Sequence, residues 1–152
     1  MRFILIMIFS LLFNLSAFAD LIKPSPDIKP KQVIQIQLDA LMGNDTPYSD
    51  FGIAQTWEFA HPDNRKFTGP LLNFTKMMKS KSYKLMLNHV SHNIILVSES
   101  ITTANYFVEL IDINGNKFGF TWIINKVLKN GKFKDCWMTT GVSKPLPLAK
   151  SA

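Results

Sequence analysis

The sequence contains very little cysteine and very little arginine. Cys136 is the only cysteine among 152 residues, so no disulfide can form within the chain. This excludes a small disulfide-stapled scaffold. Arginine occurs only at Arg2 and Arg65, and every other basic residue except histidine is a lysine. Because 47% of the residues are hydrophobic, the chain is expected to bury one core and to form one domain.

Motifs for common catalytic and metal sites are also missing. The chain has no G-x-S-x-G, P-loop, H-E-x-x-H or C-x-x-C pattern, so serine, cysteine or zinc catalysis has no support. His89 and His92 are three residues apart but have no third ligand nearby, and we expect no metal and no cofactor. The lysines are scattered and accompany no nucleic-acid recognition motif. This positive surface would suit an acidic partner or an anionic membrane, and we expect no nucleic-acid partner.

The first residues have the pattern of a secretory signal. Arg2 is followed by an apolar run from Phe3 to Phe13, and Ala17 and Ala19 occupy the small-residue positions of a cleavage site. The run is too short to span a bilayer, which needs about 20 apolar residues. We therefore expect residues 1–19 to be a cleaved signal peptide. The mature protein would be secreted or periplasmic, without a stable membrane anchor.

The remaining chain divides into a leader, a domain and a tail. Residues 20–30 contain Pro24, Pro26 and Pro30, and they are expected to be a flexible leader. Residues 31–142 are expected to form a single domain. Residues 143–152, with Pro145 and Pro147, are expected to be a flexible tail.

Helical periodicity dominates the first half of this domain. Apolar residues recur at helical spacing in 31–42 and again in 50–60, where Pro62 ends the pattern. Gly69-Pro70 opens a third helix, and a short helical turn is expected near 83–87. In the first helix, Gln35, Gln37 and Asp39 are expected to lie largely off the apolar face.

Beyond His89, β-branched and aromatic residues predict strands at 94–103, 105–113, 117–128 and 132–142. Asn114-Gly115 and Asn130-Gly131 are hairpin signals between them. The sequence therefore predicts an α+β domain, in which N-terminal helices pack on one face of an antiparallel sheet of about four strands.

Two-residue hairpin loops would fix the strand register. They place Glu109 opposite Phe120, Phe107 opposite Trp122, and Trp122 opposite Thr139. One face of the sheet would then carry Glu109 among apolar side chains, and an extra residue in a strand would undo this assignment. The apolar members of that face are Phe107, Ile111, Phe118, Phe120, Trp122, Ile124 and Trp137.

Candidate functional residues lie on this face and in the segment 57–70. Glu109 among aromatic rings could act as a general acid or base. Alternatively, it could lie near the rim, pair with a lysine, or face water if the register differs. His61 could exchange protons near neutral pH, or it could cap a carbonyl. Arg65 could bind an anion, or it could pair with Asp63 or Glu58. Asp63 and Trp57 complete the expected mouth of a pocket.

A set of short motifs resembles a known family. They are Gln37-Leu-Asp-Ala-Leu, Phe59-Ala-His-Pro-Asp-Asn-Arg, Thr68-Gly-Pro, Phe74, Tyr83, Trp122 and Cys136-Trp137-Met138. Together they resemble the domain of unknown function 4864 family across residues 31–142. The resemblance implies a cystatin-like, nuclear-transport-factor-2-like cone in which a curved sheet encloses a pocket. His61 stands where that family is expected to have serine, which weakens it as a catalytic candidate.

Three functional interpretations follow. The first is a non-catalytic module that binds a small apolar or anionic molecule, or a partner, in an aromatic-lined pocket formed by Trp57, His61, Asp63, Arg65, Phe107, Glu109, Phe120, Trp122 and Trp137. The second is a small cofactor-free isomerase or hydrolase that uses Glu109 or His61. The third is a structural module that forms a homodimer through the sheet, with its pocket filled by its own side chains.

Overall fold

The computed structural model describes residues 19–149. The expected signal peptide, 1–19, lies outside the described residues except for Ala19, and so do the last three residues of the tail. None of the helices between residues 19 and 149 is long and apolar enough to cross a membrane.

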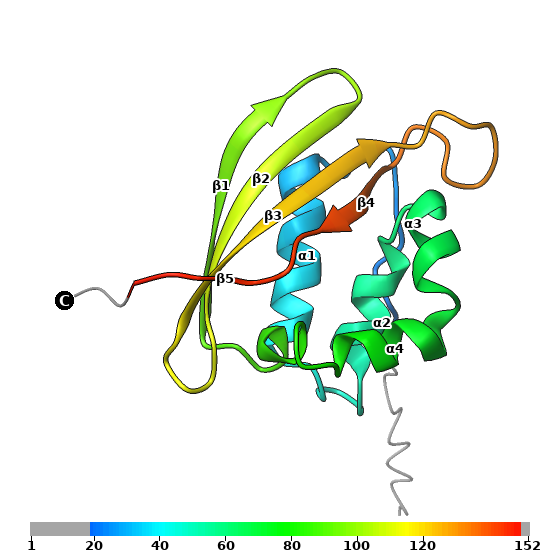
Figure 1. Ribbon diagram of the computed structural model, residues 1–152. Helices are drawn as coiled ribbons and strands as arrows, with labels where there is room; N and C mark the ends of the chain where they lie inside the picture. Colours follow the sequence, from blue (N-terminus) through cyan, green and yellow to red (C-terminus); the bar gives the residue numbers. More distant parts are fainter. Residues whose placement is uncertain (1–18, 150–152) are drawn as a thin grey trace, which may run out of the picture.

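The domain has α+β architecture, as the sequence predicts (Figure 1). Four α-helices come first: α1 (Pro30–Met42), α2 (Phe51–Glu58), α3 (Pro62–Thr68) and α4 (Leu71–Met78), followed by a 3₁₀ turn at Lys84–Met86. The strands β1 (Ser91–Glu99), β2 (Thr103–Ile111), β3 (Lys117–Lys126) and β4 (Trp137–Val142) then form an antiparallel sheet in the order β1-β2-β3-β4. A short β5 (Leu146–Pro147) also pairs with β3.

The core lies between α1 and the inner face of the sheet. The buried residues of α1 recur at helical spacing, and in β2 every second residue is buried. This alternation is the pattern of a sheet that packs one face on helices. The largest buried side chains there include Ile34, Leu38 and Leu41 of α1 with Leu110, Phe120, Trp122 and Ile124 of the sheet.

The loop from β2 to β3 is longer than expected. The backbone N–H of Asp112 donates to the Asn116 carbonyl. The side-chain Oδ1 of Asp112 accepts from the backbone N–H groups of Asn114 and Asn116 at 2.9 and 2.8 Å. Three residues, 113–115, therefore connect the strands, and Gly115 adopts the left-handed conformation that closes such a loop. The predicted two-residue turn was wrong.

This extra loop residue places the β2 residues that were predicted on the inner face of the sheet on its outer face. Tyr106, and not Phe107, pairs with Trp122, and Glu109 pairs with Gly119. Phe107, Glu109 and Ile111 therefore lie on the outer face of the sheet, whereas Phe118, Phe120, Trp122 and Ile124 remain on the inner face. The Phe107 ring lies over Gly119, where an added Cβ would collide with it.

The connection from β3 to β4 also differs from the prediction. The backbone N–H of Val127 donates to the Cys136 carbonyl at 2.9 Å, so residues 128–135 form a long loop and not a tight turn at Asn130-Gly131. A bulge between Ile123 and Ile124 then places Ile124, and not Trp122, opposite Thr139. β4 consequently begins at Trp137, later than expected.

The leader and the tail both make specific contacts. The backbone N–H of Ile22 donates to Oε1 of Gln55 at 2.8 Å, and Nε2 of Gln55 donates to the Ile22 carbonyl at 2.9 Å. Lys23 forms an ion pair with Glu58 at 2.9 Å. Part of the leader expected to be flexible is therefore held against α2. In the tail, Leu146 and Pro147 pair with Gly119 and Phe118 of β3.

Candidate functional site

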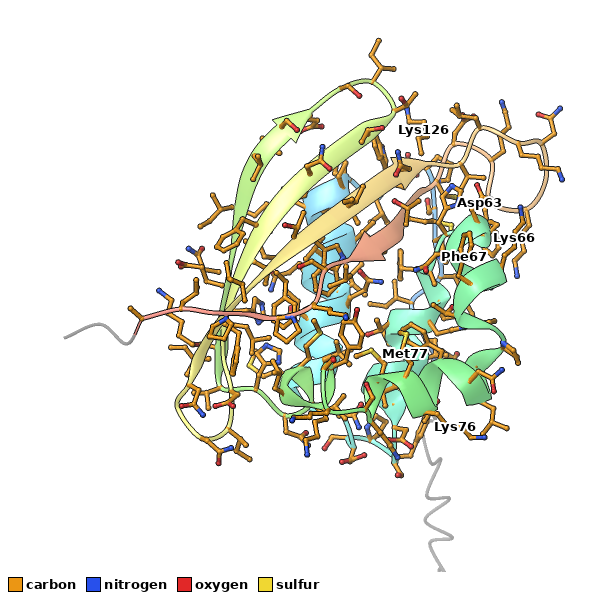
Figure 2. All side chains as sticks on the ribbon, viewed as in Figure 1. Asp63, Lys66, Phe67, Lys76, Met77 and Lys126 are labelled. Carbon is orange, nitrogen blue, oxygen red and sulfur yellow. The ribbon has the colours of Figure 1, made fainter. Side chains whose placement is uncertain are left out.

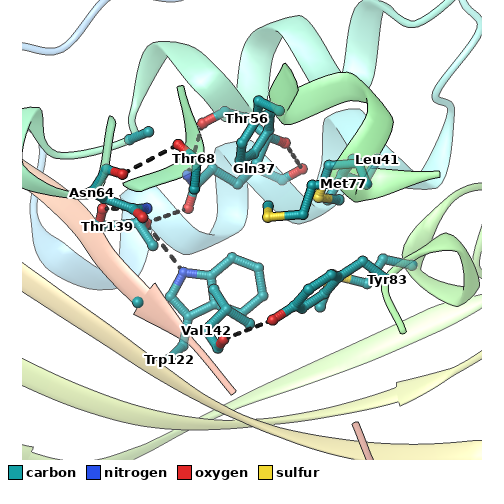
Figure 3. A pocket seen from close by; sticks show the side chains of 15 residues that line it. Gln37, Leu41, Thr56, Asn64, Thr68, Met77, Tyr83, Trp122, Thr139 and Val142 are labelled. Carbon is teal, nitrogen blue, oxygen red and sulfur yellow. Dashed lines mark hydrogen bonds between the residues drawn. The ribbon is translucent and has the colours of Figure 1, made fainter. Parts of the chain in front are cut away.

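A cavity of about 160 Å³ lies between the helices and the inner face of the sheet near β4 (Figure 3). The side chains of α1, α2, α3, α4 and β3 contribute to its wall together with β4 itself. Its apolar lining consists of Leu41, Ala60, Phe74, Met77, Met78, Met86, Trp122, Gly141 and Val142, and its polar lining of Gln37, Thr56, Asn64, Thr68, Tyr83 and Thr139.

A chain of buried hydrogen bonds forms one side of this cavity. The Trp122 indole N–H donates to Oγ1 of Thr139 at 3.2 Å, and Thr139 Oγ1 donates to Oε1 of Gln37 at 2.7 Å. The Gln37 amide then donates to the Thr56 carbonyl at 3.0 Å. Each polar group in the chain has a partner, so the polar side of the cavity is fixed before any ligand arrives.

The opposite side of the cavity is apolar and includes Met77. Tyr83 contributes one hydroxyl group to this side. Tyr83 donates to the Val142 carbonyl at 3.2 Å, which joins the segment after α4 to the end of β4. The lining contains no carboxylate, imidazole, thiol or amine. Such a cavity can enclose an apolar molecule and offer it amide and hydroxyl groups, but it presents no side chain suited to acid–base exchange near neutral pH.

Of the nine site residues predicted from the sequence, Trp122 lines this cavity. Phe120 is fully buried in the core, and Trp137 is buried with the Lys126 ammonium 5.1 Å from the centre of its ring. Phe107 and Glu109 lie on the outer face, where Glu109 pairs with Lys117 at 3.2 Å. The predicted position of Phe107 and Glu109 at the floor of the pocket was therefore wrong, because the register of β2 differs by one residue, whereas Trp122 lies where it was predicted.

The side chain of Arg65 is bound to the backbone of its own segment. Its Nε donates to the Ala60 carbonyl at 2.9 Å, and its Nη2 donates to the carbonyls of Trp57 and Glu58 at 3.0 Å each. Its guanidinium carbon lies 3.7 Å from the centre of the Trp57 ring. Arg65 therefore caps the C-terminal carbonyls of α2, where a positive charge is favoured. Burial lowers the pKa of this guanidinium from its usual value.

His61 is the N-cap residue of α3, a helix that was not predicted from the sequence. Its Nδ1 accepts from the Asp63 backbone N–H at 3.1 Å, and Pro62 occupies the first turn of α3, where its missing N–H costs nothing. The backbone N–H of His61 donates to the Thr139 carbonyl at 2.8 Å, so this segment runs beside β4. Burial is the main cause that lowers the pKa of His61.

Asp63 lies at the surface on the same helix. Its carboxylate accepts from Lys66 at 2.7 Å, and this hydrogen bond lowers the pKa of Asp63. His61 and Asp63 line a separate groove beside the β3–β4 loop and do not reach the cavity. The segment 57–70 thus divides between two sites and does not form one mouth.

His89 and His92 bond to one another. Nδ1 of His89 contacts the Met86 carbonyl at 2.7 Å, and Nε2 of His89 contacts Nδ1 of His92 at 2.7 Å. Because a carbonyl can only accept, His89 carries its proton on Nδ1 and accepts from His92. Burial is the largest cause that lowers the pKa of both rings. Among residues 19–149, no group of three His, Cys, Asp or Glu side chains could hold a metal ion.

Sequence reasoning missed most of the cavity lining, and one signal could have found part of it. Gln37 follows Val33 and Ile34 by one helical turn and precedes Leu41 by another, so it belongs to the buried stripe of α1. The expectation that it would lie off this stripe was wrong. A buried glutamine must have hydrogen-bond partners, and this requirement points to an internal polar network.

Comparison with protein-family models, with curated protein sequences and with solved structures finds no match to this chain.

Proposed function

We propose that the chain is an exported, non-catalytic binding module that holds one small, largely apolar molecule in the cavity beside Trp122. The observation that carries this proposal is the combination of an apolar wall with a polar side whose hydrogen bonds are already made. Such a site excludes strongly polar ligands, because they would have to break the Trp122–Thr139–Gln37 chain to gain partners. Export follows from the signal-like residues 1–19, and a cone of the cystatin-like type remains our proposal for the fold family.

The size of the cavity limits the ligand. An apolar cavity of roughly 150 Å³ in another protein admits benzene, and the cavity here measures about 160 Å³. A single aromatic ring or a short branched alkyl group would therefore fit without rearrangement. Larger molecules would have to leave part of their structure outside, near the half-buried Thr68 and Tyr83.

The proposal can be tested with benzene as the probe. In a titration followed by ¹H–¹⁵N correlation spectra, the indole N–H signal of Trp122 should shift and reach saturation. Val142 pairs with Trp122 in the sheet, so the two side chains share the inner face, and both line the cavity. Val142→Phe should therefore fill part of the cavity and abolish the shift while the protein stays folded.

Val90→Phe provides a matched control. Val90 is exposed and does not line the cavity. This variant should bind benzene as the unmodified protein does. Absence of a saturable shift in the unmodified protein would refute the proposal, and so would equal binding by the Val142→Phe variant.

A second candidate function is self-association through the sheet. β1 forms an outer strand of the sheet, and Ile95, Leu96 and Val97 on it are exposed. The strand Ser91–Glu99 contains no lysine and no proline, which are the residues that commonly protect such edges. Analytical ultracentrifugation should detect a dimer that Leu96→Lys disrupts; a monomer at all concentrations would exclude this candidate. The enzyme interpretation is not retained, because neither Glu109 nor His61 reaches the cavity.

A further inference from the structure

Four lysines from distant parts of the sequence gather around one groove. The groove has a volume of about 550 Å³ and lies between α3 and the β3–β4 loop. Lys66 lines it from α3, Lys126 from the end of β3, and Lys129 and Lys132 from the loop. We call this site the basic groove. Asp63 is the one carboxylate that lines it, and Asp63 is already bonded to Lys66.

The other three lysines of the basic groove form no ion pair with the residues that the structure describes. Among residues 19–149, no carboxylate lies within ion-pair distance of Lys126, Lys129 or Lys132. Two of these lysines instead rest near aromatic rings: Lys126 near Trp137, and Lys132 5.3 Å from the centre of the Phe133 ring. Such contacts orient an ammonium group without neutralising it. The groove therefore has an uncompensated positive charge.

The loop adds uncharged donors to the same place. In the described part of the chain, the backbone N–H groups of residues 128–132 donate to no protein acceptor. Consecutive free N–H groups beside lysines favour anions with several oxygen atoms, such as phosphate. The loop that lines the basic groove thus carries two kinds of donor that can bind phosphate, the lysine ammonium groups and the unbonded backbone N–H groups.

Two large apolar side chains project into solvent beside these donors. Phe67 is 90% exposed and Leu128 is 63% exposed. Leu128 lines the groove itself, and Phe67 follows Asp63 by one turn of α3, on the same side of the helix. Figure 2 shows Asp63, Lys66 and Phe67 together along α3. A soluble anion gains nothing from exposed apolar groups, whereas a lipid surface accepts them below its headgroups.

We propose that the basic groove, with Phe67 and Leu128, is a docking surface for an anionic phospholipid membrane. The lysines and loop N–H groups contact headgroup phosphates, and Phe67 and Leu128 enter the interfacial region. A few lysines and two apolar side chains give reversible attachment. This inference is independent of the ligand in the cavity, because the groove and the cavity share no lining residue.

Vesicle flotation tests the proposal. The purified protein should float with vesicles that contain phosphatidylglycerol and should stay behind with vesicles of phosphatidylcholine alone. Binding should weaken as salt is raised, because surface charges are then screened. Failure to float with phosphatidylglycerol vesicles at low salt would overturn the proposal.

Variants separate the basic groove from the general positive charge of the chain. The double variant Lys129→Ala/Lys132→Ala should lower vesicle affinity about tenfold to 30-fold. The control Lys81→Ala/Lys84→Ala removes the same charge from exposed positions outside the groove, and it should change affinity by less than about twofold. Equal losses in the two double variants would show non-specific attraction and would contradict the proposal.

Phe67→Ser distinguishes a lipid surface from a soluble phosphate compound. It should lower vesicle affinity at least about fivefold, since an apolar group no longer leaves water. It should not change the binding of inorganic pyrophosphate, measured by calorimetry. If pyrophosphate binds to the groove but vesicles do not, or if Phe67→Ser has no effect on vesicles, the groove is not a membrane-docking surface.

Discussion

Oγ1 of Thr139 donates a hydrogen bond to Oε1 of Gln37 at 2.7 Å, across 102 positions of the chain. This contact joins the first helix to the last long strand, and the Trp122 indole completes it from β3. The three side chains are all buried and belong to the wall of the cavity. The same network therefore fixes the fold and shapes the candidate binding site.

Removing the Thr139 hydroxyl should be costly. Thr139→Val keeps the volume of the side chain but leaves the Trp122 N–H and the Gln37 oxygen buried without a partner. Each such group costs about 1–3 kcal/mol, so for the two groups together the free energy of unfolding should fall by about 2–6 kcal/mol. Chemical denaturation measures this change. Thr121→Val, at an exposed position of β3, is the control and should change stability by less than about 0.5 kcal/mol.

Arg65 should prove to be structural. Arg65→Ala removes three hydrogen bonds to the carbonyls that end α2, and we expect a loss of about 2–4 kcal/mol of stability. Arg65→Lys should lose less, because an ammonium group retains the charge but not the planar arrangement of donors. A stability of Arg65→Ala within about 0.5 kcal/mol of the unmodified protein would show that the cap is unimportant.

Gly69 is required by both its conformation and its surroundings. Its φ is +75°, and an added Cβ would lie 2.8 Å from Nδ2 of Asn73. Gly69→Ala should therefore destabilise the protein by at least about 1 kcal/mol, and Gly69→Val by more. Gly43→Ala serves as the control, because Gly43 has a negative φ and open space around it. Equal thermal stability of the Gly69 and Gly43 alanine variants would contradict this account.

Stability should decrease in mild acid because of the histidines. Burial lowers the pKa of His61, His89 and His92, so the unfolded chain binds protons at a higher pH than the folded chain does. Stability is therefore lost as the pH falls from about 6.5 towards the lowered folded values, and these groups cause no further loss below them. The urea midpoint should be lower at pH 5.5 than at pH 7.5.

A variant can assign part of this pH dependence. His92→Asn keeps a donor near the position of Nδ1 but removes one titrating group from the bonded pair. The difference between the urea midpoints at the two pH values should become smaller in this variant. An unchanged difference would mean that the His89–His92 pair does not contribute.

The helices other than α3, and the existence of the strands, could be predicted, because both depend on short-range patterns. Apolar spacing predicts the helix at 31–42, and the structure places α1 at Pro30–Met42. The Asn114-Gly115 signal correctly separates β2 from β3. What the pattern could not provide was the loop length, because the Asp112 carboxylate binds two loop N–H groups and adds a residue to the turn. That one residue turned Glu109 and Phe107 away from the core.

The cavity could not be predicted for a different reason. Its lining residues extend along the sequence from Gln37 to Val142, and only packing brings Gln37 to Thr139, 102 positions away. Thr139 and Tyr83 carry no local pattern that distinguishes them from other residues of their types. Trp122 could be identified as a candidate because its size and its position in an apolar strand predict burial.

The decisive experiment is native mass spectrometry of the protein purified from the cell envelope of its own host. We expect one additional small mass on each chain, with the added molecule largely apolar and close in size to a single ring. The same preparation of the Val142→Phe variant should lack this mass. A bare chain, observed under conditions that retain added benzene in the cavity, would contradict the claim that the cavity holds a ligand.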